Sequence, residues 1–185
     1  MEQQSTSIWK SAFTYGIYLG IISILLSVII WAGGLIESMG LFGGAIIGIL
    51  SLVLTFILLF IFAKSYRNKE CGGFISFGVV LKFTFLAVII STIISIIYNY
   101  IFHSFIAPEY MENLMAVMQE KTMIFMESKG VPESQMDKAL EKFQEIPSIW
   151  KTLRQTALSG IIAGGILSLI VSAIVKKNIS DEVPE

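Results

Sequence analysis

The sequence has few of the side chains that carry metal, redox or acid–base chemistry. Its 185 residues include one cysteine, Cys71, and one histidine, His103. A single cysteine excludes a disulfide within the chain and disfavours a cysteine-based metal site. His103 has no acidic or cysteine neighbour at ligand spacing, so we interpret it as a polar residue at a membrane interface. The formal net charge of −1 also gives no reason to expect nucleic-acid binding, which usually shows as a basic face.

Sequence motifs of the common enzyme classes are missing as well. The chain has no nucleophile–base pair, no glycine-rich phosphate loop with its lysine, and no His-Glu-x-x-His helix. No carboxylate falls inside a long apolar run, although most proton-coupled transporters place one there. We therefore predict a protein that is not an enzyme and that has no cofactor and no metal site.

What the sequence does have is long apolar runs. Hydrophobic residues make up 55% of the chain and charged residues 15%, against averages of about 45–50% and about 25% in soluble domains. Crossing the hydrocarbon of a bilayer takes about 20 residues of helix. Four runs reach that length, and we predict spans over about 11–36, 40–63, 77–102 and 156–175. The predicted fold class is an all-α membrane protein, with residues 1–185 forming a single integral membrane domain.

Basic residues that flank these runs predict how the chain crosses the membrane. Cytoplasmic loops carry an excess of lysine and arginine. Five basic residues that fall on one side of a four-span arrangement are expected to set the topology: Lys64, Arg67, Lys69, Lys176 and Lys177. Lys151 and Arg154 flank the fourth run on the other side and are outnumbered. We therefore predict that both termini are cytoplasmic.

Small residues recur every four positions within the runs. Residues four apart share a helix face, and small side chains let helices approach closely where lipid removes any hydrophobic drive between them. The glycines that we predict to form helix contacts are Gly16, Gly20, Gly40, Gly44, Gly48, Gly160 and Gly164. An alternative is the general abundance of glycine in membrane helices. We favour specific packing, because three glycines in register are a stronger signal than one pair, and predict a compact four-helix bundle.

The segment of about 108–150 is the one sizeable polar part of the chain. Apolar residues at spacings of three, four and seven predict a helix that begins at Pro108 and ends at Gly130, and a second helix that ends near Ile146. We predict an extracytoplasmic amphipathic helical hairpin, inserted between spans three and four, that docks on the bundle, on lipid or on a partner. Six of the eight methionines lie in it. A Cu(I) site is one interpretation, but we favour adaptable apolar packing.

Two functions from different classes fit this pattern. The first is a non-enzymatic membrane component that packs with itself, as a homo-oligomer, or with a partner protein. The second is a small-solute or lipid-handling transporter or channel, which needs a polar cavity near Asn99, Lys82 and the serines of the spans. The serines whose surroundings would separate the two functions are Ser91, Ser95, Ser168 and Ser172. The sequence alone does not place their faces relative to one another.

Short motifs around the basic segment resemble a known family. They are Tyr66-Arg67-Asn68-Lys69, Gly72-Gly73-Phe74-Ile75-Ser76-Phe77-Gly78 and Lys82-Phe83, followed by Tyr98-Asn99-Tyr100-Ile101-Phe102 and Ile106-x-Pro108. With the helical insert before the last run, this pattern is similar to domain of unknown function 4199, a family of small four-span membrane proteins of Bacteroidota, over about residues 12–177. The resemblance implies four helices in a bacterial inner (cytoplasmic) membrane. It carries over no catalytic or binding residues, because the family has no assigned activity.

Overall fold

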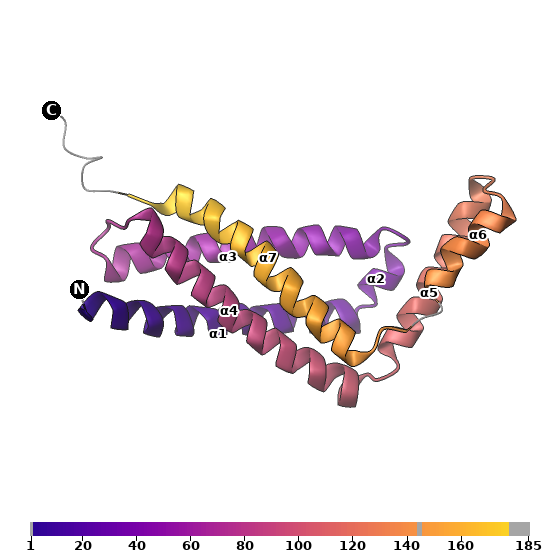
Figure 1. Cartoon of the computed structure of the whole chain (residues 1–185), viewed down its shortest axis with the longest axis horizontal. Coiled ribbons are helices and arrows are strands. Elements are labelled where there is room, and N and C mark those ends of the chain that lie inside the picture. The colour runs from indigo at the N-terminus through magenta and orange to yellow at the C-terminus, as the bar shows by residue number, and fades with distance from the viewer. Residues whose placement is uncertain (1, 144–145, 178–185) are drawn as a thin grey trace.

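The computed structural model describes residues 2–143 and 146–177, most of which are helical (Figure 1). In chain order the elements are α1 (Glu2–Ala32), α2 (Leu35–Ser38), α3 (Gly43–Glu70), α4 (Phe77–Ile101), the π-helix η1 (Phe102–Ile106), α5 (Tyr110–Ser128), α6 (Glu133–Leu140), the 3-10 helix η2 (Glu141–Phe143) and α7 (Ile149–Val175). Within these described residues, four helices are long and apolar enough to cross a membrane: α1, α3, α4 continued by η1, and α7. The predicted all-α class and the predicted number of membrane-compatible helices are therefore confirmed.

The first two long helices differ from their predicted bounds because glycines turn the chain between them. α1 ends at Ala32 rather than near residue 36, and Gly34 follows in a left-handed conformation with φ 55°. α3 begins at Gly43 rather than at Gly40, whose φ is 77°. Glycine adopts positive φ without the steric cost of a Cβ. The short helix α2 lies between these two turns.

The basic segment is helical rather than a turn. α3 continues beyond the predicted end at Ala63 as far as Glu70, and the chain turns at residues 71–73 instead. Lysine, arginine and glutamate are good helix formers. Cations in the last turn, here Arg67 and Lys69, also interact favourably with the helix dipole.

The last long helix begins one to two turns earlier than its apolar run. α7 starts at Ile149 rather than near Thr156. Ser148 is its N-cap, and the Ser148 side chain accepts a hydrogen bond from the Lys151 amide at 3.3 Å. Such a cap satisfies one of the free amides at a helix start, so the polar residues that precede the apolar run are already helical.

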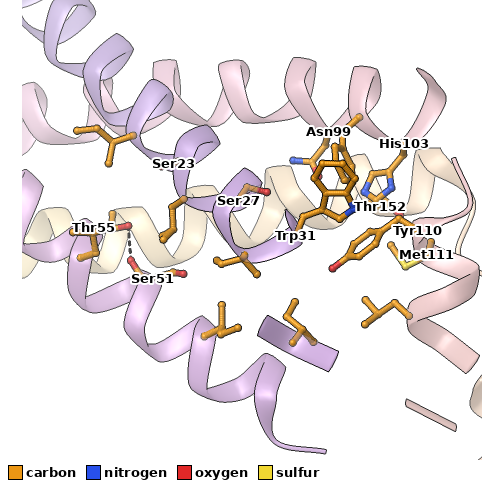
Figure 2. Close-up of a pocket in the computed structure, with 18 of the residues that line it drawn as sticks. Ser23, Ser27, Trp31, Ser51, Thr55, Asn99, His103, Tyr110, Met111 and Thr152 are labelled. Atoms are coloured by element: carbon orange, nitrogen blue, oxygen red, sulfur yellow. Dashed lines mark hydrogen bonds between the residues drawn. The ribbon is translucent and has the colours of Figure 1, made fainter. Parts of the chain in front are cut away.

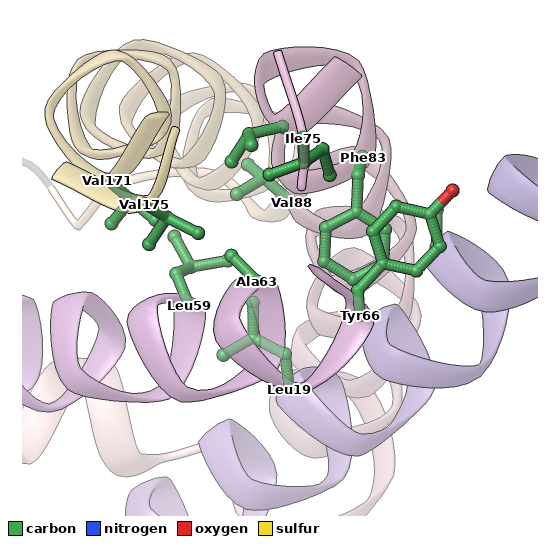
Figure 3. Close-up of a cluster of buried hydrophobic side chains, with 11 residues drawn as sticks. Leu19, Leu59, Ala63, Tyr66, Ile75, Phe83, Val88, Val171 and Val175 are labelled. Carbon is green, nitrogen blue, oxygen red and sulfur yellow. The ribbon is translucent and has the colours of Figure 1, made fainter. Parts of the chain in front are cut away.

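The buried core lies in the half of the bundle that holds both ends of the described chain (Figure 1, Figure 3). We call this the termini end, and the opposite end, where α2 and α5 lie, the insert end. α4 packs against α1 and against α7, and α3 packs mainly on α7. The buried core residues labelled in Figure 3 are Leu19, Leu59, Ala63, Tyr66, Ile75, Phe83, Val88, Val171 and Val175. The Tyr66 and Phe83 rings stack with centroids 4.4 Å apart, which joins α3 to α4.

Hydrogen bonds hold α1 against α3 at the termini end. Ser11 Oγ donates to Glu70 Oε2 at 2.5 Å, and the hydroxyls of Tyr15 and Ser65 lie 3.0 Å apart. Ser11 is buried, and hydrogen bonds to charged groups in such places are stronger than bonds between neutral groups. The two helices are thus fixed to each other at this end.

The end of α7 is also tied down here. Arg67 Nη1 donates to the Val175 carbonyl at 3.1 Å, and Ile75 and Lys177 exchange two backbone hydrogen bonds at 2.9 Å. The five basic residues expected to set the topology therefore all lie at the termini end: Lys64, Arg67, Lys69, Lys176 and Lys177. A basic side chain near a helix C-terminus satisfies carbonyls that have no partner within the helix.

The glycines divide into a packed set and an open set. Those of α1 and α7 lie against α4, namely Gly16, Gly20, Gly160 and Gly164. The tightest is Gly164, where an added Cβ would lie 2.3 Å from Val88 Cγ1. A Cβ at any of the remaining three would meet no atom within 4 Å, these being Gly40, Gly44 and Gly48. Glycine therefore brings α1 and α7 close to α4, whereas Gly44 and Gly48 of α3 would meet no atom of the described residues with an added Cβ.

The helices between α4 and α7 touch the bundle at the insert end. α6 and η2 contact α5, which leans outward from the bundle (Figure 1). Lys121 Nζ donates a hydrogen bond to the Glu37 carbonyl, and the Phe42 and Phe125 ring centroids lie 6.1 Å apart. These contacts join α5 to the turn between α1 and α3.

Gly164→Ala should lower the stability of the bundle, because the new methyl group would overlap Val88 on α4. Val88 is β-branched and stiff at χ1 in a helix, so it cannot rotate away cheaply. We expect a loss of about 1–3 kcal/mol, seen as a lower midpoint of thermal unfolding in a fixed detergent. Gly44→Ala is the matched control, since its Cβ position is open and alanine favours a helix over glycine by about 1 kcal/mol. Equal shifts in the two variants would contradict the close contact.

Candidate binding groove

A cavity of about 410 Å³ lies between the insert-end halves of α1 and α3. Figure 2 shows the side chains of Ser23 and Trp31 of α1, Ser51 of α3, Asn99 of α4 and His103 of η1 around it, with residues of α5 and α7. The two helices are held together at the termini end and joined through α2 at the insert end. The space between them is therefore bounded at both ends by contacts already described.

A second hollow of about 270 Å³ lies between α3, α4 and α7. The two hollows share Ser23, Ser51 and Thr55 in their linings, so they adjoin along α3. The other hydroxyl residues of the second hollow are Ser91, Thr92, Ser95 and Ser159. We call the two hollows together the α3 groove. The glycine contacts explain why the groove exists, because α1 and α7 pack closely on α4 and the insert-end half of α3 does not.

Several polar side chains of the groove are bonded to their own helices. Ser23 Oγ and Thr55 Oγ1 each donate to the backbone carbonyl four residues earlier, at 2.8 Å, and the Thr55 bond is drawn in Figure 2. Asn99 Nδ2 donates to the Ser95 carbonyl at 2.8 Å. This back-bonding satisfies the donor inside an apolar helix, while the oxygens keep lone pairs as acceptors. The lining can therefore accept hydrogen bonds from a ligand without disturbing its helices.

An aromatic cluster closes the insert end of the groove. The Phe102 ring centroid lies 5.3 Å from that of Trp31, 5.6 Å from Tyr98 and 5.7 Å from Tyr110. The rings of His103 and Tyr110 lie side by side, with centroids 6.3 Å apart. Phe102 and His103 begin the π-helix η1, a rare geometry that is frequent at functional sites.

Charge is absent from the wall of the groove but present close to it. No lysine, arginine, aspartate or glutamate lines either hollow in the part of the chain that the structure describes. Glu37 Oε2 and Tyr98 OH are buried oxygens without a hydrogen-bond partner among the described residues. Burial raises the pKa of the Tyr110 phenol, and the Glu37 carboxylate and Tyr98 raise it further. Tyr110 is therefore a neutral donor at physiological pH.

The serines singled out from the sequence divide between the groove and the packed core. Ser91 and Ser95 line the groove, as does Asn99. Ser168 and Ser172 have no exposed surface, and Ser172 Oγ donates to the Ser168 carbonyl at 2.5 Å. The spans thus have a tightly packed half and a hollow half, and the serine stripe of α4 faces the hollow one.

Three groove residues were not expected from the sequence. We interpreted His103 as an interfacial residue and assigned no role to Trp31 or Tyr110, although all three line the groove. The four-residue spacing of Asn99 and His103 places them on one helix face and was an available signal. Lys82 does not reach the groove and lines a separate hollow with residues of the first helix.

The helices and their composition define the class of this protein: an all-α membrane protein with four candidate spans. The model of a family described as Protein of unknown function (DUF4199) matches residues 14–177, and the chain therefore belongs to this family. No curated protein and no solved structure matches the chain. The family description names no activity, so the function has to be argued from the groove.

Two serine variants should separate the groove from the packed core. Ser51→Leu adds apolar volume beside an open cavity, so we expect a change in unfolding free energy within about 0.5 kcal/mol. Ser168→Leu adds the same volume where no space is exposed, which costs about 1–3 kcal/mol from overpacking. Thermal unfolding of both variants in the same detergent measures the difference. Destabilisation of the Ser51 variant to the level of the Ser168 variant would mean that the groove is filled by protein.

Proposed function

We propose that this chain is a non-enzymatic integral membrane protein that binds a lipid-like molecule in the α3 groove. The observation that carries the proposal is the groove itself, an open space between helices of membrane-spanning length. Its wall is apolar with hydroxyl, amide and ring N–H groups set into it, as is typical of small-molecule sites. A tightly filled interior would instead have favoured a protein whose only function is to pack with itself or with a partner protein.

We infer binding rather than catalysis from the chemistry of the wall. Its titratable side chains are His103 and Tyr110, whose rings lie against each other. A serine nucleophile needs a general base within hydrogen-bond reach. Ser23 instead donates to a backbone carbonyl of its own helix. This arrangement suits recognition of a ligand and offers no activated nucleophile.

We also propose that the protein lies in a bacterial inner (cytoplasmic) membrane with both termini in the cytoplasm. The support is the grouping of the five basic topology residues at one end of the bundle, together with the excess of basic residues in cytoplasmic loops. The segment of about 108–150 would then be an extracytoplasmic amphipathic hairpin docked on the bundle, as the contact of Phe42 with Phe125 favours. In this orientation the groove opens toward the outer leaflet.

A second candidate function is assembly with a second copy or with a partner membrane protein. The open environment of Gly44 favours it, because small residues mark the places where membrane helices approach each other and a Cβ added here would meet no atom of another described element within 4 Å. Gly40 and Gly48 share that environment. A partner helix on this face would lie beside the groove and would compete with lipid for the same side of α3.

Native mass spectrometry in a mild detergent should show the protein as a monomer that carries a lipid-like molecule of defined mass. Ser51→Leu should lower the bound fraction about tenfold, equivalent to about 1.4 kcal/mol, because the new side chain occupies the groove. Ile57→Phe is the control on the same helix, since Ile57 is 45% exposed and lies outside both linings. Oligomers without any bound small molecule would contradict the lipid proposal and favour assembly.

The single cysteine gives a direct test of the proposed orientation. Cys71 should resist a membrane-impermeant maleimide in intact cells and react with it in inverted membrane vesicles. Burial raises the pKa of its thiol, and the thiolate is the reactive form, so labelling in vesicles should keep accelerating above about pH 8.5. The control variant combines Cys71→Ser with Ser128→Cys on exposed α5 and should label in intact cells. Labelling of Cys71 from outside would reverse the orientation.

A further inference from the structure

The charge of the groove limits the head group that its ligand can carry. The described residues that line it include no lysine, arginine, aspartate or glutamate. An ion that leaves water for a low-dielectric space without a counter-charge pays a large desolvation penalty. Just outside the lining, Glu37 acts on Tyr110 and Lys121 Nζ bonds the Glu37 carbonyl, so the charges beside this end are of both signs and supply no net counter-charge for an anion. A head group that enters the groove must therefore be uncharged.

Uncommitted hydrogen-bond donors collect at the insert end. The indole of Trp31, the imidazole of His103 and the phenol of Tyr110 line this end (Figure 2) and make no hydrogen bond within the described residues. Thr152 lies beside them. A ligand oxygen placed here would accept from these groups, while its remaining atoms would extend away from them.

The remainder of the first hollow suits an apolar chain. Between α1 and α3 the apolar lining is Ile22, Leu26, Ile30, Ile47, Leu54 and Leu58. The hollows of about 410 Å³ and 270 Å³ each lie near the lower end of the range for small-molecule pockets, about 300–1,000 Å³. Such a space favours one chain over a two-chain phospholipid.

We propose that the α3 groove binds an uncharged amphiphile with a single apolar chain, its head group at the aromatic cluster and its chain between α1 and α3. This inference rests on the proposed function and names its ligand class and orientation. Trp31, His103 and Tyr110 donate to a carbonyl or hydroxyl oxygen of the head group. Ser23 and Thr55 face the chain with their hydroxyl donors already used, so they do not demand a polar partner.

Trp31 provides a spectroscopic test in the full-length protein. Trp9→Phe with Trp150→Phe removes two tryptophans that are 62% and 73% exposed and leaves Trp31 as the only one. Three brominated probes are titrated in the same detergent, because bromine quenches indole fluorescence at short range. The first is a monoacylglycerol brominated near the glycerol, the second the same lipid brominated at the chain end, and the third a lysophosphatidic acid brominated near the glycerol. Ser51→Leu in the same background measures quenching by probe dissolved in the micelle.

The expected result is saturable quenching by the head-brominated monoacylglycerol, with weaker quenching by the chain-end isomer. Half-saturation by lysophosphatidic acid should need at least about tenfold more probe, because its charged phosphate would have no counter-charge in the groove. A tenfold difference in affinity corresponds to about 1.4 kcal/mol. Equal or tighter binding of lysophosphatidic acid would overturn the uncharged head group and leave the proposed function standing. Stronger quenching by the chain-end isomer would overturn the orientation. Quenching by every probe that is no greater than in the Ser51→Leu background would overturn the proposed function itself.

Discussion

Close contact of helix backbones with α4 is the constraint on which the rest of the structure depends. In a bilayer, apolar side chains gain little free energy when they exchange contacts with lipid for contacts with another helix. Helices therefore associate where small residues let their backbones approach closely. Gly16 of α1 and Gly164 of α7 meet α4 so closely that a methyl group would collide there. α3 has glycines at the same spacing, Gly44 and Gly48, but a Cβ added at either would meet no atom of the described residues within 4 Å. It is held instead by Tyr66 on Phe83 and by hydrogen bonds at the termini end, and a helix held mainly at one end leaves a space beside the other.

Hydroxyl groups show how the two halves of the bundle differ. Ser168 and Ser172 are fully buried in the packed half, where their small size is what the contact requires. Ser51 and Ser91 have the same side chain but line the hollow half. In an apolar helix a serine hydroxyl can donate to the backbone carbonyl four residues earlier, as Ser172 Oγ does to the Ser168 carbonyl, whereas Ser168 Oγ is buried without a partner among the described residues. Serine is therefore compatible with both environments, and its presence alone does not tell a contact from a cavity.

Much of the fold could be predicted from the sequence, because length, apolar runs and four-residue spacing are one-dimensional signals. Four membrane-compatible helices follow directly from them, and so does the placing of the basic residues at one end. The structure differs from the prediction where interactions outside the apolar runs decide the bounds of a helix. The basic segment is helical as far as Glu70 because its residues are good helix formers, and α7 begins before its apolar run because Ser148 caps it. The groove was harder still, since it depends on which glycines find a neighbour and on the π-helix that presents His103.

The short helix α2 has a mechanical consequence for the groove. Its four residues lie between Gly34 with φ 55° and Gly40 with φ 77°, and hinge motion concentrates at a few such positions that absorb backbone rotation. α2 is thus a short helix with a flexible glycine at each end, while the other end of α3 is held by its contacts at the termini end. Backbone rotation at these two glycines would change the distance between α1 and α3 at this end while both long helices keep their own hydrogen bonds. Because Lys121 donates a hydrogen bond to the Glu37 carbonyl of α2, a tilt of α5 would move α2 with it and so change the width of the groove.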